Sequence, residues 1–126
     1  MEWSSINWAL NDGRPIYLQL AEHIRIQIIS GELTPGERLP SVRDLALEAA
    51  VNPNTMQKAL SELEREELVY SNRTVGRYIT ESEETIQKLR QQFVLDKLQD
   101  FLATVRPLGY SPREISRMIL EECEKE

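Results

Sequence analysis

The chain has few of the residues from which catalytic and metal centres are built. Its 126 residues include one cysteine, one histidine and 6% aromatic residues. The single Cys123 excludes an intrachain disulfide and a cysteine metal cluster, and we expect it to make a small apolar contact. His23 has no clustered ligand residue, so we expect it at the surface. The sequence also lacks a Ser/His/Asp constellation, a phosphate loop and metal-spaced residues. We therefore predict no catalytic residue, no metal and no cofactor.

Long apolar runs are missing as well. No stretch reaches the roughly 18 consecutive apolar residues of a membrane span. The first residues also lack the charged and apolar regions of a signal peptide. We expect a cytoplasmic protein with no membrane partner. A chain of 126 residues has room for one or two small domains but not for a large catalytic domain.

An excess of basic residues is also absent, since the net charge is −6. Taken alone, this charge argues against nucleic acid, which usually binds a basic patch. The acids, however, crowd into residues 62–67, 81–84 and 121–126. Residues 49–61 contain no acid and one base, and residues 68–80 contain no acid and two arginines. These acid-free segments are a local signal that the net charge hides.

Capping signals predict three helices in the first half of the chain. Pro15 suits the first position of an amphipathic helix, and Gly31 suits the left-handed position after its end. Ser41, with an acid three residues later, approximates a capping box for a second helix. Asn52 is the expected N-cap of the third helix and Pro53 its first residue.

The third helix has an apolar face and a polar face. At about 100° per residue, its apolar side chains share one side. These residues are Met56, Ala59, Leu60 and Leu63. The opposite side carries small polar groups and one base, with Thr55 on the flank. These residues are Asn54, Gln57, Lys58 and Ser61. We expect the polar face to point outward and the apolar face to anchor the helix.

Short β-prone runs surround this helical region. Residues 68–70 and 78–80 predict a hairpin whose loop, residues 71–76, is basic. A helix–turn–helix followed by a basic hairpin is the winged-helix pattern. Residues 6–10 alternate in polarity and predict a short edge strand. The predicted fold class is therefore mainly α with a small β-hairpin (α+β).

The composition changes near Thr80. Ser82 can cap a long helix that starts at Glu83, residues 107–110 break it, and Ser111 with Pro112 begins a final helix. We predict a winged helix-turn-helix domain at residues 1–80 and a two-helix dimerisation tail at 81–126. A second copy is the natural partner for the apolar stripe of this tail. The residues predicted to dimerise are Ile86, Leu89, Phe93, Leu98, Leu102, Val105, Ile115 and Ile119.

Several spaced motifs resemble those of the GntR family of bacterial transcription regulators, in the family's order. The resemblance covers roughly residues 14–80. Its motifs are Pro15-Ile16-Tyr17-Leu18-Gln19, Ser30-Gly31-Glu32-Leu33, the segment 35–46 (PGERLPSVRDLA), Val51-Asn52-Pro53-Asn54-Thr55 and Gly76-Arg77-Tyr78-Ile79. The short tail is similar to that of the YtrA-type subfamily, in which the tail mainly dimerises. The resemblance implies a homodimeric repressor, and such regulators often lie beside genes for ATP-driven transporters.

Two positions depart from the family pattern. Glu67 stands where the family usually has glycine after the recognition helix. A left-handed non-glycine residue costs on the order of 1 kcal/mol, so we expect the turn there to differ. Thr74 stands where a glycine usually precedes Gly76 by two residues, and we expect a less tight wing tip.

We predict a DNA-binding site on the second and third helices and on the wing. Asn and Gln can pair with adenine, and Lys can reach guanine or phosphate. Asn52 and the amides near it can hold a phosphate, and the wing arginines can hold the minor groove. The predicted residues are Ser41, Arg43, Asn52, Pro53, Asn54, Thr55, Gln57, Lys58, Arg73, Thr74, Gly76 and Arg77.

Each of these assignments has a plainer alternative. The polar helix face can be an ordinary solvated surface, and Arg43 can pair with Glu48 or Asp44. Arg73 and Arg77 can belong to a solvated hairpin. A winged helix that binds only proteins fits the acidic net charge, and an aminotransferase-fusion fragment is a further alternative without room for that domain here. The sequence leaves the operator and a small-molecule effector open, since the tail is short for a pocket of the usual size.

Overall fold

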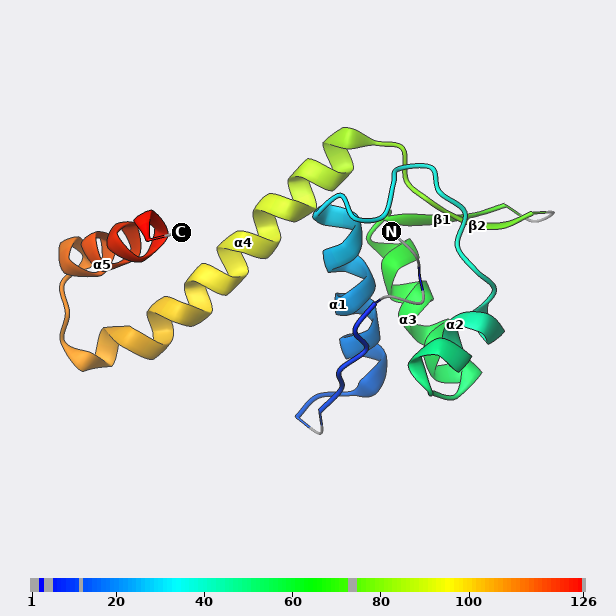
Figure 1. The fold of residues 1–126 in the computed structure, drawn as a ribbon, viewed down its shortest axis with the longest axis horizontal. Coiled ribbons are helices and arrows are strands. Elements are labelled where there is room, and N and C mark those ends of the chain that lie inside the picture. Colours follow the sequence, from blue (N-terminus) through cyan, green and yellow to red (C-terminus); the bar gives the residue numbers. More distant parts are fainter. Residues whose placement is uncertain (1–2, 4–5, 12, 73–74, 126) are drawn as a thin grey trace. The chain divides into compact units, whose positions relative to one another are not determined.

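A computed structural model describes residues 3, 6–11, 13–72 and 75–125 of the chain. The chain divides into two compact units, Met1–Arg90 and Gln91–Glu126. The first unit holds helices α1 (Ile16–Ile29), α2 (Val42–Ala49) and α3 (Pro53–Arg65), strands β1 (Val69–Asn72) and β2 (Gly76–Ile79), and the start of α4 (Glu83–Val105). Figure 1 shows α3 packed against both α1 and α2. The predicted mainly helical fold with one hairpin is confirmed.

The core of the first unit lies where α1, α2 and α3 meet. The apolar stripe of each helix points inward, as its spacing requires. The side chains that are fully or almost fully buried include Leu20, Ile24, Ile28, Leu45, Met56, Leu60 and Leu63. This shared core holds α3 by one face only, so its other face is available to solvent.

The predicted starts of α2 and α3 are confirmed by their caps. The Ser41 hydroxyl accepts a hydrogen bond from the Asp44 amide at 3.1 Å. The Asn52 side-chain oxygen accepts one from the Asn54 amide at 2.8 Å, and Pro53 is the first residue of α3. Local side-chain chemistry therefore sets where both helices begin.

Each of the three helices ends at a residue with left-handed backbone geometry. Gly31 has φ +86°, Ala50 +57° and Glu67 +65°. After α3, the Glu67 amide donates to the Glu64 carbonyl at 3.0 Å and the Leu68 amide to the Leu63 carbonyl at 3.1 Å. This is the Schellman pattern, for which glycine is preferred. The expectation that Glu67 changes the turn is therefore wrong: the left-handed turn is kept with a glutamate.

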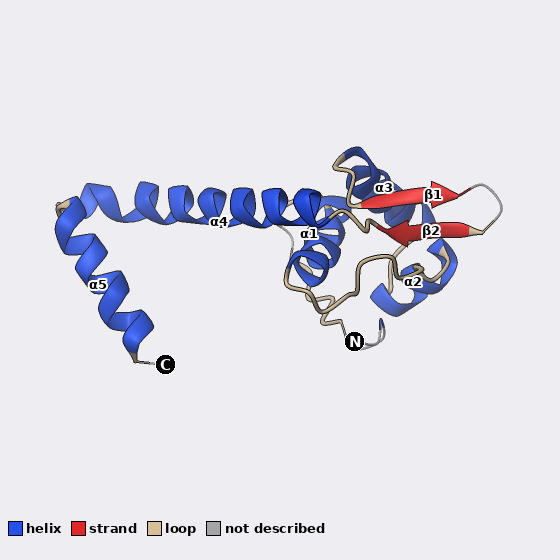
Figure 2. Ribbon diagram, turned by 90° about the horizontal axis from the view of Figure 1, so that it is seen from above, coloured by secondary structure: helices blue, strands red, loops and turns tan. Residues whose placement is uncertain are grey.

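The first strand of the hairpin extends two residues further toward the tip than predicted, because β1 ends at Asn72 and the predicted run ended at residue 70. β1 and β2 pair antiparallel beside α3, as Figure 2 shows. In the register of this pair, Ser71 lies opposite Arg77 and Tyr70 opposite Tyr78. Residues 36–39 run along the other side of β2, where the Leu39 amide donates to the Arg77 carbonyl at 2.9 Å. The segment before α2 therefore acts as a third, irregular edge of the wing.

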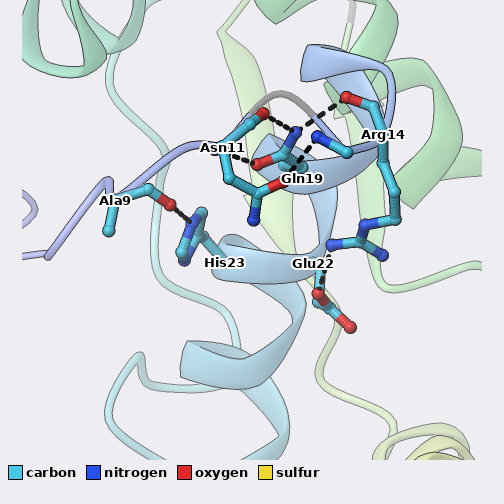
Figure 3. Close-up of polar contacts among 7 residues, drawn as sticks. Ala9, Asn11, Arg14, Gln19, Glu22 and His23 are labelled. Atoms are coloured by element: carbon cyan, nitrogen blue, oxygen red, sulfur yellow. Dashed lines mark hydrogen bonds and ion pairs between the residues drawn. The ribbon is translucent and has the colours of Figure 1, made fainter.

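The N-terminal segment is not the predicted edge strand. The structure assigns no strand to the described residues among 6–10, although Ile6 is buried. The segment follows α1 instead, as Figure 3 shows: Nε2 of His23 lies 2.7 Å from the Ala9 carbonyl oxygen, and Gln19 bonds the backbone N–H and C=O of Asn11. The side chain of His23 lies at the surface, as expected, but it is half-buried there because it packs edge-on against Trp8.

The first unit extends past Thr80 into α4. Ser82 caps this helix, as predicted, by accepting from the Thr85 amide at 3.1 Å. Ile86 is only 3% exposed, and Nε of Arg90 donates to the Ile29 carbonyl at 2.7 Å. These contacts bind the first two turns of α4 to the end of α1.

The second unit consists of the rest of α4, a short 3-10 turn η2 (Arg106–Leu108) and α5 (Pro112–Glu124). The predicted capping box is confirmed, since Ser111 and Glu114 exchange hydrogen bonds at 3.0 and 3.1 Å. Among the described residues of this unit, Ile115 is the one buried apolar side chain. None of the helices in the described part of the chain is both long and apolar enough to cross a membrane.

Candidate nucleic-acid interface

The outer face of α3 is a polar, solvent-exposed surface on a helix whose inner face is buried. On the inner face, Met56, Ala59, Leu60 and Leu63 have no exposed surface. On the outer face, four polar side chains are exposed, namely Asn54, Gln57, Lys58 and Ser61. We call these four residues the α3 polar face. This division of the helix is the one predicted from its periodicity.

Two contacts organise the α3 polar face. Nζ of Lys58 lies 4.5 Å from the centre of the Tyr17 ring on α1. Such a cation–π contact holds the ammonium group at the α1 side of the helix. The Gln57 side-chain amide donates a weak 3.4 Å hydrogen bond to the Ser61 hydroxyl, which aligns the glutamine along the helix. Gln57 and Asn54 therefore offer amide groups to an outside partner.

The amides at the start of α3 are already hydrogen-bonded. Pro53 has no N–H, the Asn54 amide donates to the Asn52 side chain, and the Thr55 amide donates to the Asn52 carbonyl at 3.0 Å. A phosphate bound here would therefore meet the Asn52 side-chain NH2 group and the helix dipole more readily than a free backbone amide. Thr55 itself is half-buried.

Arg43 projects from the first turn of α2 into solvent. It is exposed and forms no ion pair with Glu48, Asp44 or any other described residue. The alternative assignment of Arg43 to a salt bridge is therefore not supported. Ser41, which begins the same helix, is exposed but uses its hydroxyl as the cap.

Arg77 is paired within the protein. Its Nε donates to Oε1 of Glu64 on α3 at 2.5 Å, and the Ser71 hydroxyl donates to the same oxygen at 3.1 Å. The side chains of Arg77 and Glu64 are 21% and 31% exposed. Gly76 has φ +115°, which favours glycine. The predictions for Arg73 and Thr74 fall outside the described residues.

Arg38 is a candidate that the sequence interpretation missed. It pairs as a bridge with Tyr78, is exposed, and its guanidinium lies 3.7 Å from where a Cβ would stand on Gly76. A cation therefore sits on the outer side of the wing, opposite the face that carries Arg77. The Pro35-Gly36 turn signal gave no indication that the following residues join the sheet.

The residues predicted to dimerise fall into different environments. Ile86 belongs to the core of the first unit, so its burial needs no second copy. In the second unit, an apolar groove of about 310 Å³ runs between α4 and α5 and includes Leu98, Leu102, Ile115 and Ile119 in its lining. Further apolar side chains that were not predicted are exposed in this unit. They are Val94, Leu95, Phe101, Leu108, Tyr110, Met118 and Leu120.

The fold and this site define a winged helix-turn-helix protein of the class that regulates transcription by binding DNA. Residues 16–79 match the family described as bacterial regulatory proteins of the gntR family. The chain belongs to the GntR family. Its relatives are transcription regulators, not enzymes.

Two relatives from Bacillus subtilis (strain 168) match most of the chain. The uncharacterised HTH-type transcriptional regulator YhcF is 38% identical over 102 residues, which is 81% of this chain and 84% of YhcF. The HTH-type transcriptional repressor YtrA is 32% identical over 108 residues, covering 85% and 83% of the two chains. The resemblance to a YtrA-type regulator is thereby confirmed.

Two solved structures are similar as well. A GntR family transcriptional regulator from Listeria monocytogenes has a TM-score of 0.83 at 33% identity, covering 89% of this chain and 98% of that one. The DNA-binding domain of AraR in complex with operator ORX1 has a TM-score of 0.53 at 27% identity, covering 56% of this chain and 93% of that one. The protein is therefore a DNA-binding transcription regulator.

Proposed function

We propose that the protein is a homodimeric repressor that binds an inverted-repeat operator and blocks transcription by occupying it. The observation that carries the proposal is the α3 polar face, exposed on a helix whose other side is fully buried. A helix held in this way can enter the major groove, where its side chains reach base edges. When the operator lies in a promoter, the bound protein would exclude RNA polymerase from that promoter.

Within this proposal, different residues have different tasks. Asn54, Gln57 and Thr55 contact bases, and Lys58 contacts a base or a phosphate from its place beside Tyr17. The remaining predicted residues contact the sugar-phosphate backbone of the DNA or shape the wing. They are Ser41, Arg43, Asn52, Pro53, Arg73, Thr74, Gly76 and Arg77. Arg38 joins this group as a candidate phosphate contact on the outer side of the wing.

The proposed dimer rests on the poor burial within the second unit. A pair of helices with Ile115 as its buried apolar side chain cannot supply its own core. The groove between α4 and α5 and the apolar side chains around it are a surface that a second copy would cover. A closed twofold dimer presents two equivalent copies of α3 to the DNA, so the operator should have the same twofold symmetry as the dimer.

The regulated genes are proposed from the likeness to YtrA-type regulators alone. That likeness favours a neighbouring operon for an ATP-driven transporter. Transcript levels of the adjacent genes, measured with and without the protein, test this part. We also propose that the protein works in the cytoplasm, because DNA is its ligand.

A salt titration of DNA binding tests the main proposal. Duplexes selected from a random library by the wild-type protein serve as the operator probe, and binding is followed by fluorescence anisotropy. Neutralising several phosphates predicts that log K falls steeply and linearly with log salt, by about 0.9 per phosphate. Binding without salt dependence, or selected sequences without twofold symmetry, would contradict the proposal.

Variants test the assignment of the residues. Gln57→Ala should lose about 1–3 kcal/mol at one base position and relax discrimination there. Arg43→Ala should weaken all sequences evenly and lower the salt slope by about 1. Gln91→Ala, which removes an exposed glutamine from α4, is the matched control and should bind as the wild type does. Full affinity in both Gln57→Ala and Arg43→Ala would show that the assigned face is wrong.

A further inference from the structure

The contact between the wing and α3 involves one carboxylate and two hydrogen-bond donors. Oε1 of Glu64 accepts from Nε of Arg77 at 2.5 Å and from the hydroxyl of Ser71 at 3.1 Å. Ser71 and Arg77 are directly opposed across the hairpin, so both side chains leave the same face of the sheet. Glu64 therefore connects α3 to both strands at one point.

This arrangement places a negative charge where a DNA-binding surface would be expected to carry only positive charge. Arg77 lies in a wing segment, residues 68–80, that contains no acid, and its side chain is 21% exposed. A guanidinium that is paired with a carboxylate offers little net charge to a phosphate, whereas a free guanidinium attracts phosphates of any sequence. The pair is also partly exposed, so a phosphate can compete for Arg77.

We propose that Glu64 is a positioning residue that sets DNA specificity by holding and neutralising Arg77. On arbitrary DNA, Arg77 stays with Glu64 and adds little affinity. On a duplex that seats α3 fully, the wing is brought close enough for a phosphate to share the guanidinium. The proposal rests on the proposed function, because it assumes that α3 and the wing bind the same duplex.

Glu64→Gln tests this role with little change in shape. Glutamine keeps an acceptor oxygen for Ser71 and Arg77 but removes the negative charge. We expect affinity for a random-sequence duplex to rise roughly 3- to 10-fold at low salt, and the salt slope to steepen by about 0.9, the value of one additional phosphate. The ratio of affinities for the selected and the random duplex should fall, because the random duplex gains more.

Two controls separate this effect from the loss of any acid. Glu62→Gln removes the same charge from the same helix, but Glu62 pairs with the exposed Arg65 and not with the wing. It should leave the salt slope and the specificity ratio close to those of the wild type. In an Arg77→Gln background, Glu64→Gln should have no further effect on either quantity, since the residue through which it acts is gone.

The outcomes distinguish this inference from the function on which it rests. Wild-type binding that does not depend on salt would overturn the proposed function and this inference with it. Salt-dependent wild-type binding, together with Glu64→Gln and Glu62→Gln variants that cannot be told apart, would overturn this inference alone. A Glu64→Gln effect that persists without Arg77 would do the same.

Discussion

Replacing Glu67 by glycine should stabilise the first unit. Glu67 holds φ +65° in the turn that joins α3 to β1. A left-handed residue with a Cβ costs roughly 1–2 kcal/mol, and glycine loses about 0.5–1 kcal/mol of extra chain entropy on folding. The difference predicts a net gain of about 0.5–1 kcal/mol. For a domain of this size, that gain raises Tm by roughly 2–8 °C.

The substitution also removes a negative charge close to the C-terminal end of a helix. An acid there opposes the helix dipole by about 0.3–1 kcal/mol. Glu67→Ala is the matched control, because alanine removes the charge but keeps the Cβ and its strain. Glu67→Gly should therefore unfold at a higher temperature than Glu67→Ala, and the difference between the two variants measures the backbone term.

The assay is thermal unfolding followed by far-UV circular dichroism at one fixed protein concentration, since self-association makes Tm depend on concentration. Ala50, with φ +57°, should respond to glycine in the same direction. Gly31→Ala should lower Tm, although nothing lies within 4 Å of the added Cβ. If Glu67→Gly melted at or below the temperature of Glu67→Ala, the strain argument would be refuted.

Three further results are expected. Arg25→Ala should cost about 1–3 kcal/mol in urea unfolding, because the paired Arg25 and Glu66 side chains are each 19% exposed and two hydrogen bonds would be lost; an unchanged midpoint would contradict this. The Ser111 amide lowers the pKa of Glu114, so this contact stabilises α5 at pH values above the ordinary glutamate pKa, and the stabilisation is lost as the pH falls through the lowered pKa. On acidification, circular dichroism should therefore show a larger loss of helix in the wild type than in Glu114→Gln. Equal losses in the two proteins would count against this prediction. Ile119→Asp should raise the dimer Kd by at least about tenfold in sedimentation equilibrium, since the charge would be buried against a second copy; unchanged association would place the dimer interface elsewhere.

Local signals predicted the helix starts well. The N-caps at Ser41, Asn52, Ser82 and Ser111 depend on hydrogen bonds to amides two or three residues away. Such contacts are written into a short stretch of sequence, so no knowledge of the tertiary fold is needed. The two faces of α3 were predictable for the same reason, because periodicity alone assigns them.

Long-range contacts were not predictable from these signals. Alternation at residues 6–10 shows that one side is buried, but it does not say whether the neighbour is a strand or a helix; here the neighbour is α1, bound through His23. The pair between Arg77 and Glu64 joins residues 13 positions apart on different elements. The apolar stripe of α4 likewise gave no sign that Ile86 packs in its own chain while the later residues of the stripe are half-buried or exposed. The roles of the predicted site residues in DNA binding stay predictions.

The contacts between α4 and α1 decide where the chain can be truncated without disrupting the first unit. A fragment that ended at Thr80 would lose the Ile86 side chain from the core and leave the Ile29 carbonyl without the Arg90 guanidinium. A fragment that ended after Arg90 would keep both. We therefore predict that the shortest fragment able to fold and bind DNA on its own includes the first two turns of α4, a helix that composition alone would assign to dimerisation.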